Sequence, residues 1–273
     1  MQTWVNGALL ADPEAAVLPV TDHGFTVGDG VFESVKVVGG EPFALTRHLD
    51  RLAGSARGLG LAEPSRADVR RAIDAVLSAE PLPLGRLRIT WTAGPGPLGS
   101  GRSEGAGTLA VVAVPLEPRA ETTVVVTVPW TRNERSAVAG LKTTSYAENV
   151  IALAEAQRRG ATEAIFANTR GDLCEGTGSN VFYVVDGQLR TPTLGSGCLA
   201  GVTRALLLEW VGATEVDEPI ETLGRADEVF LASTTRDVQA VRRCDDRELA
   251  APGPMTREAM RTWAEREGDD LDP

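Results

Sequence analysis

Amine chemistry is the first possibility that this sequence raises, because the chain uses lysine so sparingly. Lysine and arginine together number 27, and the only lysines are Lys36 and Lys142. A lysine that loses its proton can form an imine with a carbonyl group, whereas arginine stays protonated at any accessible pH. Lys142 lies in the stretch GLKTTSYAENV, before a hydroxyl-rich run. It is a Schiff-base candidate, although a surface or salt-bridged lysine explains the position equally well.

Three further stretches carry groups that could hold a ligand. Tyr146 follows Lys142 by four residues, at a predicted helix start. Glu175 ends a short apolar strand before Gly-Thr-Gly-Ser-Asn, and is either a turn cap or a buried anion paired with a cation. The run Gly201-Val202-Thr203 opens a predicted helix, whose first backbone N–H groups could bind a phosphate. Ordinary N-capping explains this last run as well.

Charge and hydropathy exclude several classes of protein. The net charge is −11 and the pI about 4.8, so we expect no nucleic-acid partner. The longest apolar runs are too short to span a bilayer, and the N-terminus lacks the layout of a signal peptide. Three cysteines without paired metal-ligand spacing indicate reduced thiols, no metal and a cytoplasmic location.

The first part of the chain predicts a mixture of strands and helices. Asn6-Gly7 is typical of a type I′ hairpin, and VFESVKVV at 31–38 alternates like a strand before Gly39-Gly40. Apolar spacing predicts one helix from about Leu45 to Leu59, and a second from Ser65, with Asp68 at capping-box spacing. Strands are expected at 86–93 and 108–116, joined by a loop rich in glycine and proline.

The second part predicts more strands with helices between them. A helix is expected from Tyr146 to Arg159, with Ser145 and Glu148 at capping-box spacing. A last helix should begin at Thr256 and end in a frayed acidic tail. Strands are expected at 162–167, 172–175, 180–185, 188–191 and 228–233, with Asp186-Gly187 as a hairpin turn. The pattern predicts two α/β domains, 1–116 and 123–273, joined by a linker at 117–122.

Taken together, six ordered motifs resemble those of the class IV pyridoxal-phosphate aminotransferases. This family includes D-amino-acid and branched-chain aminotransferases and aminodeoxychorismate lyase. The resemblance implies an α/β (α+β) fold with a small N-terminal domain, a larger strand-rich, barrel-like domain that binds the cofactor, and an active site at the domain interface. It also implies a homodimer. The motifs are GDGVFESVKV (28–37), RHLDRL (47–52), LKTTSYAENV (141–150), EGTGSNVF (175–182), LAGVTR (199–204) and FLASTTRDVQAV (230–241).

The resemblance also implies a role for each matching residue. Lys142 would bind pyridoxal 5′-phosphate as a Schiff base and move protons, and Glu175 would pair with the pyridine nitrogen. Tyr146 would hydrogen-bond the phenolic oxygen, and Leu199 would pack against the ring. The phosphate would be bound by Arg51, Val202, Thr203 and Thr235. Asn180 is a further cofactor candidate, although capping a turn explains it equally well.

The substrate is less well specified. The arginine and histidine that clamp a carboxylate in D-amino-acid aminotransferases align near Leu98 and Ser100. Arg102 could substitute for that clamp. His48 is interpreted as a helix-face residue, and Cys174 and Cys198 as core residues. His23 precedes the GDG turn, near the expected substrate channel, and has no assigned partner. The other substrate candidates are Phe25, Ser34 and Thr234.

We therefore expect a transaminase that moves an amino group from a D-amino acid or (R)-amine to a 2-oxo acid. An aminodeoxychorismate lyase that releases pyruvate to give 4-aminobenzoate is the nearest alternative, because Ser34 fits its pattern. A branched-chain L-amino acid aminotransferase is a third. Outside this family, a class I aldolase or a non-catalytic binding protein would account for Lys142 without the phosphate and pyridine partners.

Overall fold

The computed structural model describes residues 1–273, and the chain divides into two compact units. Unit 1 comprises Met1–Pro118, Leu141–Ser145 and Leu271–Pro273, and unit 2 comprises Arg119–Gly140 and Tyr146–Asp270. Two segments expected in the second domain, 141–145 and 271–273, thus belong to unit 1 by their contacts. No helix is both long and apolar enough to cross a membrane.

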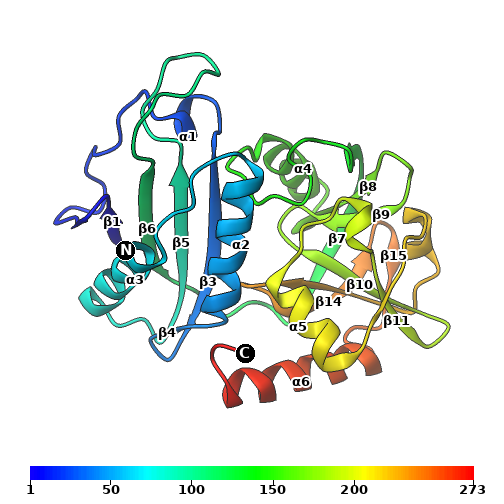
Figure 1. The fold of residues 1–273 in the computed structure, drawn as a ribbon. Helices are drawn as coiled ribbons and strands as arrows, with labels where there is room; N and C mark the ends of the chain where they lie inside the picture. Colours follow the sequence, from blue (N-terminus) through cyan, green and yellow to red (C-terminus); the bar gives the residue numbers. More distant parts are fainter. The chain divides into compact units, whose positions relative to one another are not determined.

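Unit 1 is built on a six-stranded antiparallel sheet (Figure 1). The strand order is β2-β1-β6-β5-β3-β4. The strands are β1 (Gln2–Val5), β2 (Ala8–Leu9), β3 (Gly30–Val38), β4 (Glu41–Pro42), β5 (Leu84–Thr92) and β6 (Thr108–Pro115), and the helices are α1 (His23–Thr26), α2 (Leu45–Gly58) and α3 (Arg66–Ala79).

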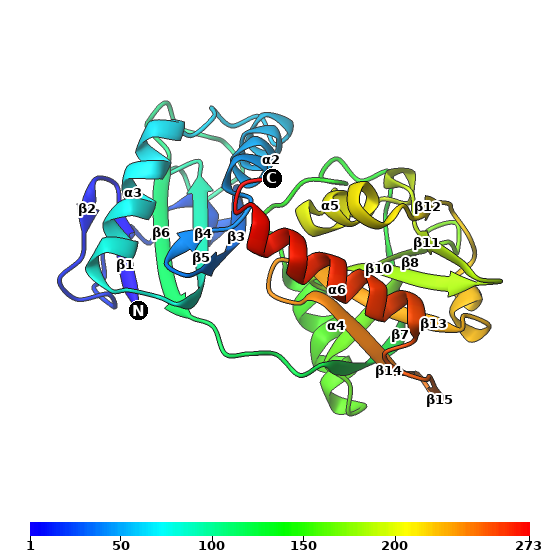
Figure 2. The same ribbon diagram turned by 90° about the horizontal axis from the view of Figure 1, so that it is seen from below.

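Helices α2 and α3 cover one face of this sheet (Figure 2). The alternation of β3 explains the packing, because Val31, Val35 and Val37 point into the core below the helices. Leu49 and Leu52 of α2 join the same core. Burial of these apolar side chains is the main force that holds the unit together.

The turns of unit 1 confirm their predictions. Asn6 and Gly7 both have positive φ, +43° and +103°, as a type I′ turn requires, and they join β1 to β2. Gly39 and Gly40 likewise join β3 to β4. Ser65 caps α3, since its Oγ accepts from the backbone N–H of Asp68 at 3.3 Å.

Unit 2 contains a nine-stranded mixed sheet and three helices (Figures 1 and 2). Eight strands run in the order β12-β11-β10-β13-β14-β7-β8-β9, and β15 pairs with β14. The strands are β7 (Thr122–Arg132), β8 (Glu163–Asn168), β9 (Leu173–Gly176), β10 (Asn180–Val185), β11 (Gln188–Thr191), β12 (Thr214–Glu215), β13 (Glu228–Ser233), β14 (Asp237–Cys244) and β15 (Arg247–Glu248). The helices are α4 (Ala147–Arg158), α5 (Val202–Val211) and α6 (Pro254–Asp269), with 3₁₀ turns at Leu194–Ser196 and Ile220–Gly224.

Alternation along β7 separates two apolar cores in unit 2. Val124, Val126 and Val128 pack with Ala152 and other residues of α4. Val125 points the other way, into a core formed largely by β8, β10, β13 and β14. Helix α5 contacts β13, and α6 contacts β13 and β14. The predicted hairpin turn at Asp186-Gly187 is confirmed by positive φ at both residues.

The predicted capping box of α4 and the predicted ends of the last helix are wrong. Helix α4 has Tyr146 as its N-cap without a side-chain capping bond, while the Ser145 hydroxyl donates to Gly28 O at 3.1 Å. Pairing with the β3 region therefore replaces the expected capping box. The last helix begins at Pro254, where proline tolerates the first turn, and runs to Asp269 rather than fraying.

The segment Leu271–Pro273 is ordered against the start of α2. Ala44, the N-cap of α2, has φ of +52° and no side chain that could cap the helix. Asp272 supplies the cap instead: Oδ1 accepts from Thr46 N at 2.8 Å and Oδ2 from Thr46 Oγ1 at 2.6 Å. Ala44 N donates to Leu271 O at 2.6 Å. The N-terminus of α2 is thus completed by residues more than 200 positions away.

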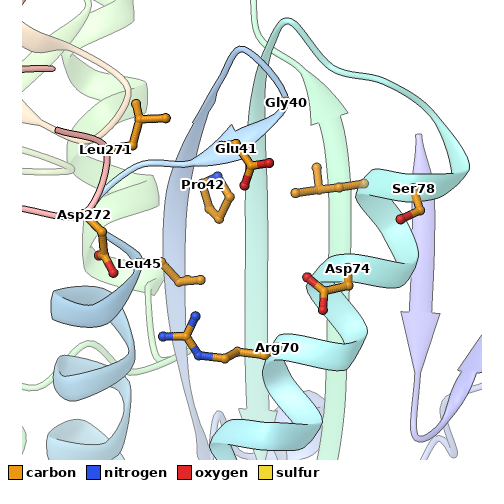
Figure 3. A pocket seen from close by; sticks show the side chains of 10 residues that line it. Gly40, Glu41, Pro42, Leu45, Arg70, Asp74, Ser78, Leu271 and Asp272 are labelled. Carbon is orange, nitrogen blue, oxygen red and sulfur yellow. The ribbon is translucent and has the colours of Figure 1, made fainter. Parts of the chain in front are cut away.

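A surface pocket of about 510 Å³ lies beside this cap (Figure 3). Its walls are formed by the β3–β4 turn, by helices α2 and α3, and by the C-terminal segment. Its lining residues are Gly40, Glu41, Pro42, Leu45, Arg70, Asp74, Leu77, Ser78, Leu271 and Asp272.

Candidate active site

Lys142 is fixed in unit 1 by backbone hydrogen bonds to the start of β3. Phe32 N donates to Lys142 O at 3.0 Å, and Thr144 N donates to Gly30 O at 2.8 Å. The backbone N–H of Lys142 donates to the hydroxyl of Ser55 on α2 at 3.2 Å. These contacts hold the lysine between a strand edge and a helix, so its backbone is far more constrained than that of a surface loop.

Two cationic side chains contact one aromatic ring beside Lys142. The lysine Nζ lies 4.3 Å from the centre of the Phe32 ring, and the guanidinium carbon of Arg88 lies 3.3 Å from the same centre. Arg88 stands on β5, directly opposite Ser34 on β3. Ser34 is half-buried. The site near Lys142 thus contains a fixed positive charge that the sequence did not single out.

Arg51 takes part in a buried ionic cluster on the helix-covered face of the sheet. Its Nε donates to Glu33 Oε1 at 2.7 Å and its Nη2 to Oε2 at 2.6 Å. His48 Nδ1 lies 2.7 Å from Glu33 Oε2. Burial raises the pKa of the Glu33 carboxyl, but Arg51 and His48 outweigh burial and bring that pKa to about 2. Burial lowers the pKa of His48, against the opposing effect of Glu33.

His48 is therefore not a simple helix-face residue. It is 1% exposed and lies in the same cluster as the predicted phosphate ligand Arg51. The signal was present in the sequence: Glu33 is the one charged residue at a core-facing position of VFESVKVV. A buried carboxylate needs cationic or hydrogen-bonding partners, and the motif RHLDRL supplies two of them on one helix face.

Arg102 has a structural partner within unit 1. It forms a bidentate ion pair with Asp29 (Nε–Oδ2 and Nη2–Oδ1, both 2.6 Å) and donates to the carbonyls of Leu59 and Gly60. The Phe25 and Leu98 side chains are 78% and 77% exposed in the single chain. Arg88 shares the Phe32 ring with Lys142, whereas Arg102 is held by Asp29.

His23 holds the glycine- and proline-rich loop. Its Nε2 lies 2.8 Å from Pro97 O, and its other ring nitrogen lies 3.7 Å from Asp29 Oδ2. A Cβ added at Gly96 would collide with the imidazole, which explains the glycine at that position. His23 is thus a loop-anchoring residue of unit 1.

In unit 2, Glu175 is an anchored anion. Leu199 N donates to its Oε2 at 2.9 Å, and Arg132 Nε lies 3.2 Å from its Oε1. The Arg132 guanidinium also lies over the Phe166 ring, 4.2 Å from its centre. Glu175 is thus a largely buried carboxylate paired with a cation, one of the two readings that its sequence position allowed. Arg132 is a partner that sequence reasoning missed.

The start of α5 lies close to Glu175 through Leu199 and is open to an anion. Gly201 is the N-cap and offers no side-chain oxygen, so the first N–H groups of the helix, from Val202 and Thr203, have no side-chain cap. Asn180 Nδ2 donates to Leu199 O at 2.9 Å, which agrees with the turn-capping interpretation of Asn180. Thr234 and Thr235 lie half-buried in the turn between β13 and β14.

The three cysteines are buried free thiols. Burial raises the pKa of Cys198 to about 11 and that of Cys244 to about 12, and it raises the pKa of Cys174 further. Thiols that stay protonated are poor nucleophiles, so the interpretation of Cys174 and Cys198 as core residues is confirmed.

Each of these groups, taken within its own unit, suits one part of a cofactor. The amine of Lys142 suits an aldehyde, the carboxylate of Glu175 suits a protonated ring nitrogen, and the uncapped start of α5 suits a phosphate. Schiff-base chemistry with a phosphorylated pyridine cofactor is the class of activity that these separate groups suit.

Comparison with known proteins identifies the family. The model of amino-transferase class IV matches residues 30–244. A putative branched-chain-amino-acid aminotransferase of Methanocaldococcus jannaschii is 31% identical, over 91% of this chain and 90% of its own length. A D-alanine aminotransferase of Listeria monocytogenes is 28% identical, over 97% and 96%. The crystal structure of a branched-chain aminotransferase from Thermoproteus uzoniensis superposes with a TM-score of 0.90 at 28% identity, over 97% of this chain and 94% of that one. The chain belongs to the class IV aminotransferases.

Membership confirms several predictions. The fold is the mixed α/β fold of type IV aminotransferases. The protein is an enzyme of a pyridoxal-phosphate-dependent family whose members act on amino and keto acids. The class I aldolase and the non-catalytic binding protein are thereby excluded. The roles of the individual site residues stay predictions.

Proposed function

We propose that this enzyme moves an amino group from a D-amino acid or an (R)-amine to a 2-oxo acid. The main support for a 2-oxo acid as the amino acceptor is the position of Arg88, whose guanidinium contacts the same Phe32 ring as Lys142. An arginine next to the reacting amine is suited to a carboxylate, because its planar fork binds both oxygens. The D-series donor is supported by the similarity to D-alanine aminotransferases along nearly the whole chain.

Pyridoxal phosphate, when bound, supplies an aldehyde that links to amines and a ring that withdraws electrons from the neighbouring C–H bond. Lys142 Nζ would hold the cofactor covalently. The same Nζ would serve as the base that takes the proton from the substrate Cα. Glu175 would keep the ring nitrogen protonated, and the Tyr146 phenol would donate to the phenolic oxygen.

The remaining cofactor contacts would fix the ring and the phosphate. Leu199 would pack on the ring face, where its backbone N–H already orients Glu175. Asn180 would act through the Leu199 carbonyl. The phosphate would be bound by Arg51, the N–H groups of Val202 and Thr203, and the Thr235 hydroxyl.

Substrate contacts are assigned within the same proposal. Arg88 would bind the carboxylate of the 2-oxo acid, and Ser34 opposite it would contribute a hydroxyl. Phe25 and Thr234 would be further substrate contacts. Arg102 would serve indirectly, by holding Asp29.

The aminodeoxychorismate lyase is a second candidate, because half-buried Ser34 stands opposite Arg88. A hydroxyl beside a carboxylate-binding arginine suits a hydroxylated or enol-ether acid as well as an amino acid. Branched-chain L-amino acid transfer is a third, on the names of the relatives at 31% and 28% identity.

A parallel substrate test separates the three. The purified enzyme is incubated with D-alanine, D-glutamate, (R)-phenylethylamine or L-leucine, each with 2-oxoglutarate or pyruvate, and separately with aminodeoxychorismate. We expect conversion of at least one of the first three. Conversion of L-leucine alone would favour the branched-chain activity, and release of pyruvate from aminodeoxychorismate alone would favour the lyase.

The proposal includes a homodimer, as the family resemblance implies. Light scattering coupled to gel filtration measures it directly, with a mass twice that of the 28.8 kDa chain expected. A cytoplasmic location also stays a prediction.

A further inference from the structure

Glu163, at the start of β8, is a buried carboxylate that none of the proposed roles uses. Its side chain is 2% exposed, and both of its oxygens are occupied by donors from elsewhere in unit 2. A buried ionised group is tolerated only where several hydrogen bonds replace its lost hydration. The identity of its donors therefore indicates what the carboxylate is for.

One set of donors comes from the loop after Glu175. Thr177 donates to Glu163 Oε1 from its backbone N at 2.9 Å and also from its hydroxyl, and Ser179 Oγ donates to Oε2 at 3.1 Å. Gly176 must be a glycine here, since an added Cβ would lie 2.5 Å from Ser179 Oγ and 3.1 Å from the Glu163 carboxyl carbon. The carboxylate thus folds the loop 176–179 back onto β8.

An ion-pair partner comes from the turn between β13 and β14. Arg236 Nη2 lies 3.5 Å from Glu163 Oε2, and the same nitrogen donates to Thr162 O at 3.2 Å. Arg236 directly follows Thr235, and its N–H closes the turn on Ser233 O at 3.0 Å. One carboxylate therefore joins two loops that lie more than 50 residues apart in the sequence.

These two loops adjoin or contain residues to which the proposed function assigns the cofactor or the substrate. Glu175 immediately precedes the first loop, and Thr234 and Thr235 lie in the second. We propose that Glu163 is a positioning residue for the cofactor site, holding the Glu175 loop and the Thr235 turn in register with each other. This inference rests on the proposed roles of Glu175 and Thr235.

Unit 2 offers a matched control for a purely structural role. Glu228 is 7% exposed and caps α6, accepting from Met255 N at 3.1 Å, Thr256 N at 2.8 Å and Thr256 Oγ1 at 2.7 Å. It is likewise buried and accepts from backbone N–H and hydroxyl groups as Glu163 does, but it holds a helix rather than the two loops.

The test compares E163Q with E228Q and the unmodified protein. Glutamine keeps the size of the side chain but replaces one acceptor oxygen with a donor, which would face Ser179 or Arg236. Three quantities are measured: the affinity of the apoprotein for pyridoxal phosphate, backbone amide exchange at 176–179 and 234–236 in the apoprotein, and the midpoint of thermal unfolding.

We expect E163Q to bind the cofactor about tenfold more weakly or worse, as for a lost charge-assisted hydrogen bond. Amide exchange in both loops should rise in E163Q. The control E228Q should lower the unfolding midpoint while leaving the cofactor affinity and both loops unchanged. A folded E163Q with unmodified affinity and exchange would overturn the proposal.

If E163Q does not fold, E163D supplies the test, because it keeps the charge on a shorter arm that cannot reach both loops. Unaltered affinity and exchange in E163D would equally overturn the proposal. Failure of the proposed function looks different: the unmodified protein would not bind pyridoxal phosphate through Lys142, while the exchange experiment would still report on the two loops.

Discussion

The side-chain nitrogen of Lys142 lies 4.3 Å from the centre of the Phe32 ring. The guanidinium carbon of Arg88 lies 3.3 Å from the same centre. Cation–π contacts of this kind fix the direction of a side chain as well as contributing about 0.5–2 kcal/mol. The aromatic residue of the GDGVFESVKV motif thus orients both the reacting amine and the arginine that we assign to the acceptor carboxylate.

The first prediction concerns Arg88. R88A should raise the KM for the 2-oxo acid by roughly ten- to a hundredfold, because a charge-assisted carboxylate contact contributes about 1.5–3 kcal/mol. The absorbance of the bound cofactor should stay unchanged. Steady-state kinetics with varied 2-oxo acid provides the measurement.

R86A is the matched control for that experiment. Arg86 lies two residues earlier on β5 and is exposed, so its removal should leave KM near the unmodified value. An equal rise of KM in both variants would point to general electrostatic attraction rather than to a specific contact at Arg88.

The second prediction is acid sensitivity from the Glu33 cluster. The Glu33 carboxyl has a pKa of about 2 in the folded protein against an ordinary value of 4.5. The unfolded chain therefore takes up this proton first as the pH falls. The stabilisation is complete above pH 4.5, is lost on approach to pH 2, and amounts to about 3 kcal/mol.

His48 adds to the effect in the same direction. Its pKa is lowered from 6.5 by burial, so the unfolded chain is protonated at a pH where the folded protein keeps the imidazole neutral. The free energy of unfolding, measured in urea between pH 8 and pH 3, should fall below pH 6.5 and more steeply below pH 4.5. The E33Q variant should be less stable at pH 7 and show a weaker dependence below pH 4.5. Parallel curves for the two proteins would contradict this account.

The third prediction concerns the cap that Asp272 places on α2. D272A leaves Thr46 N and Oγ1 without this acceptor, and should lower the free energy of unfolding by about 1 kcal/mol, as for other N-cap losses. Asp269 is an exposed acid at the end of α6 and supplies the control. D269A should have no such effect, because an acidic residue near a helix C-terminus is unfavourable. Equal destabilisation by both substitutions, seen in urea unfolding, would rule out the cap.

The sequence predicts a structural feature well where residues adjacent in the chain determine that feature. Asn6-Gly7 and Asp186-Gly187 form the expected turns because asparagine, aspartate and glycine tolerate the positive φ values that these turns require. The Ser145 capping box fails because a partner distant in sequence, Gly28 O, competes for the hydroxyl.

The candidate site residues likewise divide into those that local sequence marks and those that distant contacts determine. Lys142 and Glu175 stand out by residue type, spacing and motif. Arg88, which shares the Phe32 ring with Lys142, and Arg132, which pairs with Glu175, do not stand out, because strand register and sheet pairing bring them there. Asp272 caps a helix from the other end of the chain, and no local signal marks it.

The central claim is that Lys142 binds pyridoxal phosphate covalently, and the chain's only other lysine provides the control. Absorbance spectra are recorded for the unmodified protein, K142R and K36R after reconstitution with the cofactor. We predict an absorbance band that makes the unmodified protein and K36R yellow and that persists through gel filtration. Borohydride should trap the cofactor on both proteins. K142R should lack the band. A borohydride-stable cofactor adduct on K142R, or none on the unmodified protein, would contradict the account.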